Sequence, residues 1–236
     1  FRSVQAAIVI DETPPTVTKI VYLPFLEDTP DLQVTIPGDP VLQWPDEVDD
    51  LTYPSLSDGT MQPAMYYAPP DTGQPVPLLV ALHTWATDYS QSSSGPYAQW
   101  AIANGWVFIA PNFRGPNNQP SATGSDLVVG DIYSAVVYAK NHANIDPHRI
   151  YLIGASGGGY TALQVLGRYP DIWAGVSAWV PISDLKAWYY ETVSNPSYSH
   201  YAADIVNSCG GIPGASQKVD DEYYARSPIN FLGNAI

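Results

Sequence analysis

The sequence predicts an α/β fold, in which helices cover both faces of a mainly parallel, twisted sheet. Short apolar segments alternate with longer segments whose apolar residues recur at helical spacing. The short segments are almost continuously apolar, which is typical of strands buried on both faces of a parallel sheet. One of them, at 150–153, runs directly into a glycine-rich turn that a helical pattern follows. Alternation of this kind indicates parallel strands joined by crossover helices.

The elements of this fold are expected in order from residue 51 onward. A hairpin is predicted from strands at 51–57 and 61–68, because Asp58-Gly59 between them favours a tight turn. Residues 189–217 have no clean period and predict an irregular insertion over one edge of the sheet. A short helix is expected at 220–225, before Ser227-Pro228 interrupts the final segment. The remaining strands are expected at 78–83, 107–110, 150–153 and 175–180, and the remaining helices at 97–104, 127–144 and 161–168.

The first 50 residues differ in character from the rest of the chain. They are rich in proline and acidic residues and contain β-like pieces at 6–10 and 17–23. We interpret residues 1–50 as an N-terminal extended or β-rich arm, and residues 51–236 as the main domain.

The balance of charges and the lack of certain motifs exclude several partners. Nine Lys and Arg residues face 23 Asp and Glu residues, which gives a net charge of −14. Binding to nucleic acid or to an anionic membrane needs clustered positive charge, so neither is expected. No apolar run approaches the length of a membrane span. No spacing of ligating residues indicates a metal, and the glycine-rich turn lacks the lysine of a phosphate-binding loop, so no cofactor is expected.

The start of the chain and its composition favour a secreted or extracytoplasmic protein. The chain begins at Phe1, without an initiator methionine or a recognisable signal peptide, which is typical of a mature, processed or partly observed chain. The low lysine content, the 23 prolines and the many tyrosines and tryptophans suit this location. The single cysteine, Cys209, excludes an internal disulfide.

The stretch from Gly154 to Gly158 carries the clearest chemical signal. A Gly-x-Ser-x-Gly sequence between a buried strand and a helix forms a nucleophile elbow, a sharp turn that exposes the serine Oγ. Gly154 and Gly158 are needed because the strand and the helix approach too closely for a Cβ. The amide of Gly157 lies at the helix start, where it can stabilise a developing oxyanion. Ser156 is therefore the candidate nucleophile, and the alternative is a plain strand–turn–helix corner.

Together with further segments in the expected order, this elbow resembles the α/β-hydrolase superfamily, and within it the prolyl-oligopeptidase-like serine hydrolases and esterases. The resemblance covers roughly residues 50–236 and implies an α/β-hydrolase fold with serine hydrolase activity. The segments are 79–85 as strand and oxyanion loop, 111–115 as an Asn-x-Arg-Gly segment, Asp131 at the opening of a helix, 146–150 before the elbow strand, 177–184 after it, and 223–228 near the end.

The resemblance also implies that the catalytic acid and histidine lie beyond this chain. In such enzymes the next strand delivers the acid and the last strand and its loop deliver the histidine, in the order Ser, Asp, His. The chain ends at Ile236, before either, so its sheet is expected to lack the last strands. Two sources are open: a second polypeptide cleaved from the same precursor that completes the sheet, or the continuation of one longer chain.

A weaker alternative triad lies within the chain. His200 follows Ser156 and Asp184 in the order of a triad, and Asp184 comes just after a strand end. His200, however, lies in the irregular insertion rather than after a core strand. The other histidines are expected to support the oxyanion loop (His83) or to be solvated (His142 and His148).

Other residues near the elbow are candidates for binding. The second oxyanion donor is expected from the loop after His83, with Thr84 and Trp85 as candidates. Arg114 could bind a substrate carboxylate, but we favour internal pairing that shapes the floor beneath this loop. Aromatic side chains near the elbow could stack on sugar rings or phenolic esters. The candidate substrate-pocket residues are Arg114, Tyr160, Trp188 and Tyr189.

Two classes of function remain open. The first is a serine hydrolase that cleaves an ester or amide through an acyl-enzyme on Ser156. An esterase acting on a small-molecule or carbohydrate-linked ester is favoured over a peptidase, because no propeller that would gate peptides precedes the main domain. The second is a non-catalytic α/β-hydrolase-like binding or structural module, which the missing acid and histidine motivate.

Overall fold

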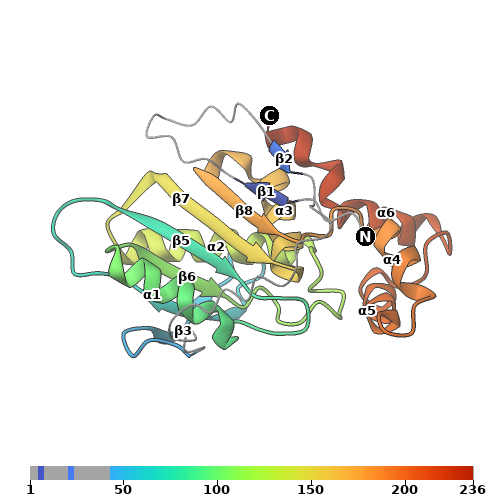
Figure 1. Ribbon diagram of the computed structural model, residues 1–236, viewed down its shortest axis with the longest axis horizontal. Helices are drawn as coiled ribbons and strands as arrows, with labels where there is room; N and C mark the ends of the chain where they lie inside the picture. The colour runs from blue at the N-terminus through green and yellow to red at the C-terminus, as the bar shows by residue number, and fades with distance from the viewer. Residues whose placement is uncertain (1–4, 8–20, 24–42, 236) are drawn as a thin grey trace, which may run out of the picture.

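The computed structural model describes residues 5–7, 21–23 and 43–235, and a six-stranded sheet lies at its centre (Figure 1). The strand order is β3-β4-β6-β5-β7-β8. β6, β5, β7 and β8 are parallel, whereas β4 is antiparallel to both β6 and β3. The predicted mainly parallel sheet is confirmed, and the predicted hairpin forms its antiparallel edge. The strands are β3 (Asp49–Pro54), β4 (Met61–Tyr67), β5 (Val76–Leu82), β6 (Val107–Pro111), β7 (Ile145–Ala155) and β8 (Gly175–Trp179).

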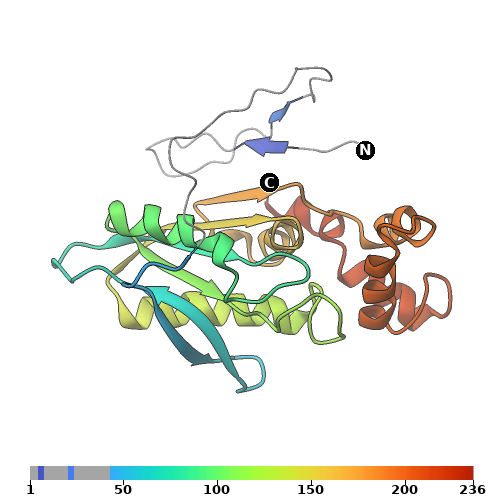
Figure 2. The ribbon, with the colours of Figure 1, turned by 60° about the horizontal axis from the view of Figure 1, so that its bottom comes forward.

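Helices cover both faces of this sheet, as the sequence predicts. They are α1 (Gly95–Ala103) on one face, and α2 (Asp126–His142) and α3 (Gly157–Arg168) on the other (Figure 2). The side chains of β5 alternate between the two layers: Leu79 and Ala81 pack with α1, while Leu78 and Val80 pack with α2 and α3. Both faces of the strand are therefore buried, which explains why its sequence is continuously apolar.

A separate layer of three helices lies beyond the carboxyl ends of the parallel strands (Figures 1 and 2). It consists of α4 (Leu185–Val193), α5 (Ser199–Cys209) and α6 (Gln217–Ala225). The irregular insertion predicted at 189–217 is wrong, because this range contains the end of α4 and all of α5. Local capping defines these helices: the Asp184 side chain accepts the Ala187 amide, and Gly210 ends α5 in the left-handed region at φ 78°. The buried residues of α5 include Ala202, Ile205 and Cys209, which recur at helical spacing over only three turns.

Two details of the elements around the elbow differ from the prediction. β7 begins at Ile145, five residues earlier than expected, because residues 147–149 are exposed and polar and so lack the apolar signal of a buried strand. Asp131, which was expected to open a helix, instead lies buried in the second turn of α2. That helix begins at Asp126. The preceding residue, Ser125, caps it, because its hydroxyl accepts a hydrogen bond from the Val128 amide.

The N-terminal arm is described only in part. β1 (Gln5–Ala7) pairs antiparallel with β2 (Val21–Leu23), and both overlap the β-like pieces expected at 6–10 and 17–23. The remainder of those pieces lies outside the described residues. β8 forms one edge of the six-stranded sheet, and β1 of the arm lies next to it (Figure 1). Within the described ranges, no helix combines the length and the apolar character that crossing a bilayer requires.

Candidate active site

Ser156 occupies a strained turn between the end of β7 and the start of α3. Its φ is 55° and its ψ is −120°, a left-handed conformation that side-chain-bearing residues rarely adopt. The Ser156 amide donates to the Trp179 carbonyl at 2.9 Å, and the Ser156 carbonyl accepts the Tyr160 amide at 2.9 Å. The side chain is half-buried, so the Oγ lies within reach of solvent. This is the geometry of a nucleophile elbow.

The glycines of the elbow are required by the close approach of three backbone segments. A Cβ on Gly154 would lie 2.3 Å from the Gly158 carbonyl oxygen. A Cβ on Gly158 would lie 2.5 Å from the carbonyl oxygen of Leu82, the last residue of β5. Any side chain at either position would push the strand away from the helix. The Gly-x-Ser-x-Gly spacing therefore follows from the packing of β5, β7 and α3 around one serine.

Two backbone amides beside Ser156 have no acceptor among the described residues. Gly157 is the first residue of α3, where amides lack partners within the helix. A Cβ on Gly157 would lie 2.4 Å from the backbone nitrogen of Trp85, so the two amides belong to touching segments. By contrast, the Thr84 amide donates to Gln91 Oε1 at 2.9 Å. Of the two donors left open by the sequence, the Trp85 amide is thus the one that is free to face an oxyanion.

His83 lies buried beneath this loop and contacts backbone on both sides. Its Nδ1 lies 2.9 Å from the Thr84 carbonyl oxygen and its Nε2 lies 2.7 Å from the Asn112 carbonyl oxygen. The imidazole stacks on the Phe113 ring, with centroids 3.8 Å apart. Burial lowers the pKa of His83 below its usual value, which favours the neutral ring. Each ring nitrogen faces a backbone carbonyl, and the single N–H of the neutral ring can donate to one of them. His83 therefore supports the loop and does not face Ser156 as a base.

The residues of the weaker alternative triad are engaged elsewhere. The Asp184 carboxylate accepts the Ala187 amide at 3.0 Å and caps α4. His200 is exposed in the first turn of α5, and its ring packs on Tyr201 with centroids 4.0 Å apart. Among the described residues, no hydrogen bond joins Ser156 to either of them or to any histidine. The structure therefore does not assemble Ser156, Asp184 and His200 into a relay.

Arg114 is held inside the protein by two carboxylates. Its Nε and Nη2 bind the buried Asp131 at 2.6 and 3.0 Å, and its Nη1 and Nη2 bind Asp58 at 2.9 and 3.0 Å. These hydrogen bonds raise the pKa of Arg114, and those from Arg114 lower the pKa of Asp58. The pocket role that the sequence left open for Arg114 is therefore replaced by internal pairing, which ties α2 to the β3–β4 turn.

Two of the other candidate pocket residues are core residues. Tyr160 has no exposed surface, and its hydroxyl donates to the Arg226 carbonyl at 2.7 Å. Burial raises the pKa of Tyr160 above its usual value. Tyr189 is also buried and packs edge-on against Tyr223, with centroids 6.2 Å apart. Neither ring is therefore available to a substrate in this arrangement.

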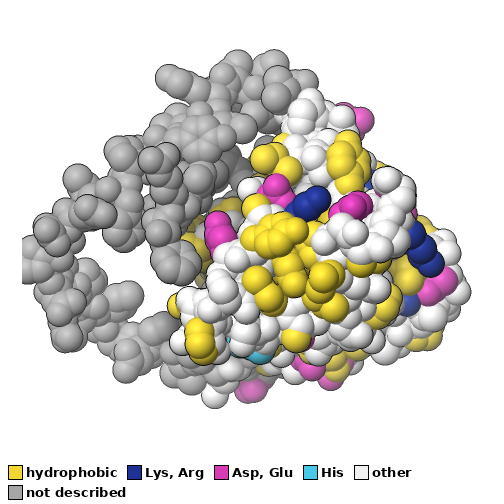
Figure 3. Space-filling model, turned by 90° about the vertical axis from the view of Figure 1, so that its right-hand side faces the viewer, with side chains coloured by type: hydrophobic (Ala, Val, Ile, Leu, Met, Phe, Trp, Pro, Cys, Tyr) yellow, Lys and Arg dark blue, Asp and Glu magenta, His cyan; other side chains and the backbone are white. Residues whose placement is uncertain are grey.

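Trp188 remains half-buried and belongs to an aromatic cluster on the oxyanion loop. The Trp85 and Trp188 rings meet edge-to-face with centroids 4.9 Å apart, and Tyr201 lies 5.0 Å from Trp188. The Trp85 indole Nε1 donates to Asp204 of α5 at 3.0 Å. The cluster thus joins the helical layer to the loop beside the elbow. Figure 3 shows apolar side chains on the face formed by this layer, and its elements carry the exposed residues Tyr190, Val193 and Tyr224.

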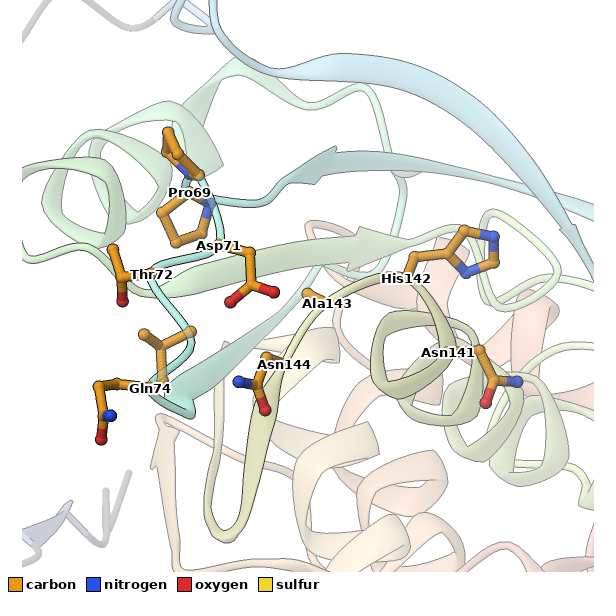
Figure 4. Close-up of a pocket in the computed structure, with 10 residues that line it drawn as sticks. Pro69, Asp71, Thr72, Gln74, Asn141, His142, Ala143 and Asn144 are labelled. Carbon is orange, nitrogen blue, oxygen red and sulfur yellow. The ribbon is translucent and has the colours of Figure 1, made fainter.

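A cleft of about 380 Å³ lies at the other end of the sheet. Figure 4 shows its lining, which comes from the loop before β5 and from the end of α2. Val76 and Asn144 mark the amino ends of β5 and β7, whereas Ser156 follows the carboxyl end of β7. This cleft is therefore remote from the elbow. Within the described ranges, no group of histidine, cysteine and acidic side chains is arranged to hold a metal ion.

Three residues of the site were not anticipated from the sequence: Gln91, Asn117 and Asp204. The Gln91 side chain accepts a hydrogen bond from the Thr84 backbone amide, and the Asp204 carboxylate accepts one from the Trp85 indole. The backbone amide of Asn117 donates to the Trp85 carbonyl at 2.8 Å. Each acts by a side-chain or loop hydrogen bond that links distant segments. Hydrogen bonds between segments far apart in the chain carry no periodic signal, so only the folded structure reveals these contacts.

The sequence profile of the prolyl oligopeptidase family matches residues 92–209, which is half of the chain. The chain belongs to the prolyl oligopeptidase family. The matched residues include the elbow, α3, β8, α4 and α5. Membership in this family makes the serine-hydrolase elbow, rather than a plain strand–turn–helix corner, the appropriate interpretation of the Gly-x-Ser-x-Gly sequence.

The curated relatives that this chain matches include both peptidases and an esterase. The chain is 25% identical to the uncharacterised protein YfhR of Salmonella typhi over 190 residues, which is 77% of this chain and 59% of that protein. It is 28% identical to dipeptidyl aminopeptidase BIII of Pseudoxanthomonas mexicana, over 58% of this chain and 21% of that protein. It is 29% identical to feruloyl esterase B of Thermothelomyces thermophilus, over 45% of this chain and 39% of that protein. The chain thus spans less than two thirds of the length of each.

Solved structures share the fold at low sequence identity. Puromycin hydrolase superposes with a TM-score of 0.63 at 20% identity, covering 84% of this chain and 30% of that one. Oligopeptidase B from Leishmania major superposes with a TM-score of 0.58 at 19% identity, covering 78% of this chain and 26% of that one. The fold is therefore the α/β-hydrolase fold of the prolyl oligopeptidase family.

Proposed function

We propose that this chain carries the nucleophile of a serine esterase, and that Ser156 forms the acyl-enzyme. One observation carries the proposal: Ser156 sits in a left-handed elbow, with the unpaired amides of Gly157 and Trp85 on touching segments beside it. Preorganised amides of this kind stabilise the negative charge that develops on a carbonyl oxygen during attack. Any helix start leaves amides free, but a plain corner between a strand and a helix would have no need for a strained serine or for a second free amide from another loop.

The proposed reaction proceeds in two steps. Ser156 Oγ forms a bond to the ester carbonyl carbon while its proton passes to a histidine base. The carbonyl oxygen becomes an oxyanion that accepts from the Gly157 and Trp85 amides, and the C–O bond to the leaving alcohol then breaks as the histidine returns the proton to that alcohol. Water attacks the resulting acyl-enzyme in the same way and releases the acid, which restores Ser156.

The histidine and the acid that orients it are proposed to come from a segment beyond Ile236. Two observations support this source. The described histidines make no hydrogen bond to Ser156, and the edge strand β8 binds the Ser156 amide through Trp179, so a strand added beside β8 would end near the elbow. That segment is either a second polypeptide from the same precursor, completing the sheet, or a continuation of one chain.

An ester with an aromatic or carbohydrate-linked group is the proposed substrate. Support comes from Trp188 of α4 and Tyr201 of α5, half-buried rings that pack on Trp85 of the oxyanion loop, since aromatic faces pack against phenolic and sugar rings. Further support comes from the similarity to feruloyl esterase B. Dipeptidyl aminopeptidase BIII is a relative of comparable identity, so a peptide amide is the competing substrate that the experiment must include.

The test uses the complete natural protein and a fluorophosphonate probe, which labels activated serines covalently. We expect labelling at Ser156, hydrolysis of an aryl ester faster than of a peptide anilide, and loss of both labelling and turnover in Ser156→Ala. A folded wild-type protein that stays unlabelled would favour a non-catalytic binding or structural module. Faster cleavage of the anilide would retain the nucleophile and reject the esterase.

A secreted or extracytoplasmic location is also proposed for this protein. The support is compositional: few lysines, 23 prolines and a net charge of −14. Cell fractionation of the natural source tests it, together with intact-mass measurement of the purified protein under denaturing conditions. Recovery in the cytoplasmic fraction would reject the location. Two mass species, one near 25.6 kDa, would support the second polypeptide.

A further inference from the structure

A polar network centred on Gln91 surrounds the loop that carries Trp85. Gln91 Oε1 lies 2.9 Å from the Thr84 amide nitrogen and 2.6 Å from Thr87 Oγ1. An amide oxygen has two lone pairs, so these two donors saturate it, and the Thr84 hydroxyl can donate to Thr87 Oγ1 at 3.0 Å instead. On its other side, Gln91 Nε2 donates to Ser94 Oγ at 2.9 Å. Every polar atom of the Gln91 side chain therefore has a partner.

The orientation of the Gln91 amide follows from the chemistry of its neighbours. A backbone N–H can only donate, so the atom that faces the Thr84 amide must be the side-chain oxygen rather than the nitrogen. Ser94, whose hydroxyl accepts the hydrogen bond from Gln91 Nε2, is buried at the start of α1. Gln91 thus anchors Thr84 to a rigid part of the fold, and it removes the Thr84 amide from competition for an oxyanion.

The next peptide, between Thr84 and Trp85, is fixed from the opposite side. The Thr84 carbonyl oxygen lies 2.9 Å from His83 Nδ1, and the Trp85 carbonyl accepts the Asn117 amide at 2.8 Å. In a trans peptide the C=O and the N–H point in opposite directions. Holding the Thr84 carbonyl on His83 therefore aims the Trp85 N–H away from His83. The backbone nitrogen and the Cα of Trp85 both lie against Gly157.

We propose that Gln91 is a positioning residue that sets the second donor of the oxyanion hole. It holds Thr84 in the one orientation that leaves the Trp85 amide free and aimed at the reacting carbonyl. Loss of the Gln91 oxygen leaves the Thr84 amide without an acceptor, and it leaves the Thr87 hydroxyl to donate to the oxygens of Thr84 itself. The Thr84–Trp85 peptide can then rotate and present a carbonyl oxygen, which repels an oxyanion. This inference rests on the proposed hydrolase function.

The kinetic signature of such a role is specific. The Trp85 amide would bind the oxyanion far more strongly than the ground-state carbonyl, so its misplacement should lower kcat and leave KM nearly unchanged. Outright removal of an oxyanion donor costs about 10²- to 10³-fold in kcat. Misorientation of a donor that remains present should cost less, about 10- to 100-fold.

The experiment compares three variants of the complete protein. Gln91→Met keeps the length of the side chain but removes its oxygen, whereas Gln91→Glu keeps an oxygen for Thr84 and can accept a hydrogen bond from Ser94. Gln62→Met is the matched control, because it also removes a buried amide, one that donates only to Thr60 in the β3–β4 hairpin. Fluorophosphonate titration gives the concentration of active sites, so that kcat refers to folded enzyme only.

Each variant is assayed on an ester and on the matching thionoester, whose sulfur is a weak hydrogen-bond acceptor. We expect Gln91→Met to lower kcat on the ester about 10- to 100-fold with little change in KM, and to lower the ester-to-thionoester rate ratio by a similar factor. Gln91→Glu should stay within about threefold of wild type, and Gln62→Met should be unchanged. A purely structural role would lower the number of active sites without changing this ratio.

Two results would overturn the inference. One is an unchanged kcat and an unchanged rate ratio in Gln91→Met. The other is an equal loss in Gln91→Met and Gln91→Glu. If Gln91→Met does not fold, Thr87→Val removes one partner of the same oxygen, and it should change the rate ratio in the same direction by a smaller factor; no change would reject the role. Failure of the hydrolase proposal looks different, because the wild-type protein would then not be labelled at Ser156 at all.

Discussion

The backbone amide of Ser156 donates a hydrogen bond of 2.9 Å to the carbonyl of Trp179. Trp179 is the last residue of β8, and it pairs with Ala155, the last residue of β7. The bond therefore extends the pairing of the two strands by one residue, into the elbow itself. With the Tyr160 amide bound to the Ser156 carbonyl, the serine is held from two sides in a left-handed conformation. Strain persists in a fold only where surrounding contacts determine it in this way.

Ser156→Gly is expected to stabilise the fold while abolishing activity. Glycine adopts positive φ without steric cost, so the substitution should relieve about 1–3 kcal/mol of backbone strain, less the extra entropy of glycine in the unfolded chain. Ser156→Ala removes the same hydroxyl but keeps the Cβ and thus the strain. Urea unfolding of both inactive variants measures the difference, with Ser156→Gly expected to be the more stable by about 1 kcal/mol. An alanine variant that is the more stable by about 0.5–1 kcal/mol, the entropy cost of glycine alone, would show that the elbow stores no strain.

Arg114→Met should destabilise the protein strongly, because it leaves the fully buried Asp131 carboxylate without its charge partner. Loss of one partner of a buried pair costs about 3–5 kcal/mol. The double variant Arg114→Met/Asp131→Asn removes the unpaired charge and should recover more than half of that loss. Asp58→Asn, at the more exposed end of the network, should have little effect. The free energy of unfolding from urea titrations tests all three, and a double variant no better than Arg114→Met would contradict the charge explanation.

The elements predicted well from the sequence are those that bury a continuous apolar surface. The strands at β5 and β6 and the helix at α2 came within a few residues of their predicted ranges, because packing on both faces of the sheet requires such patterns. The helical layer was missed where α4 and α5 depend on a cap by Asp184 and on the left-handed Gly210. Caps occupy single positions, and a periodic pattern does not detect them.

The residues of the candidate site differ in the same way in how far the sequence predicts them. Ser156 and the glycines around it could be predicted, because close approach of a strand and a helix restricts residue type at fixed spacing. Tyr160 was assigned to a pocket although its ring is buried and its hydroxyl binds Arg226. The role of Gln91 depends on a side-chain contact across a loop. Such contacts are set by the folded geometry and leave no pattern in the chain.

Cys209 should resist thiol reagents until the helical layer opens. The thiol is buried at the end of α5, and this burial raises its pKa to about 12, so very little reactive thiolate exists near neutral pH. We expect the native protein to react with a disulfide reagent at least about 100-fold more slowly than the urea-unfolded protein. Arg226→Lys should speed the native reaction, because it weakens the hydrogen bonds that join α6 to the carbonyls of Pro120, Ala122 and Thr123. Rapid labelling of the native wild type would show that α5 opens readily.

Stability should fall as the pH is lowered through the titration range of His83. Burial holds the pKa of His83 below its usual value of 6.5, although the hydrogen bonds with the Thr84 and Asn112 carbonyls act in the opposite direction. Just below pH 6.5 the unfolded chain therefore binds more protons than the folded protein, so the free energy of unfolding decreases as the pH falls. The hydrogen-bonded carboxylates of Asp58, Asp88 and Asp146 have pKa values below 3.8. They become protonated at lower pH and so do not change the stability in the range where His83 titrates.

Urea midpoints measured between pH 5 and pH 7.5 test this expectation. Wild type should lose stability across the lower half of this range, and His83→Gln should flatten that slope even if its stability is lower at every pH. A slope that survives in His83→Gln would mean that another group titrates. Stability that instead rises toward pH 5 would mean that the folded state binds the proton more tightly, with His83 as an imidazolium donating to both the Thr84 and the Asn112 carbonyls.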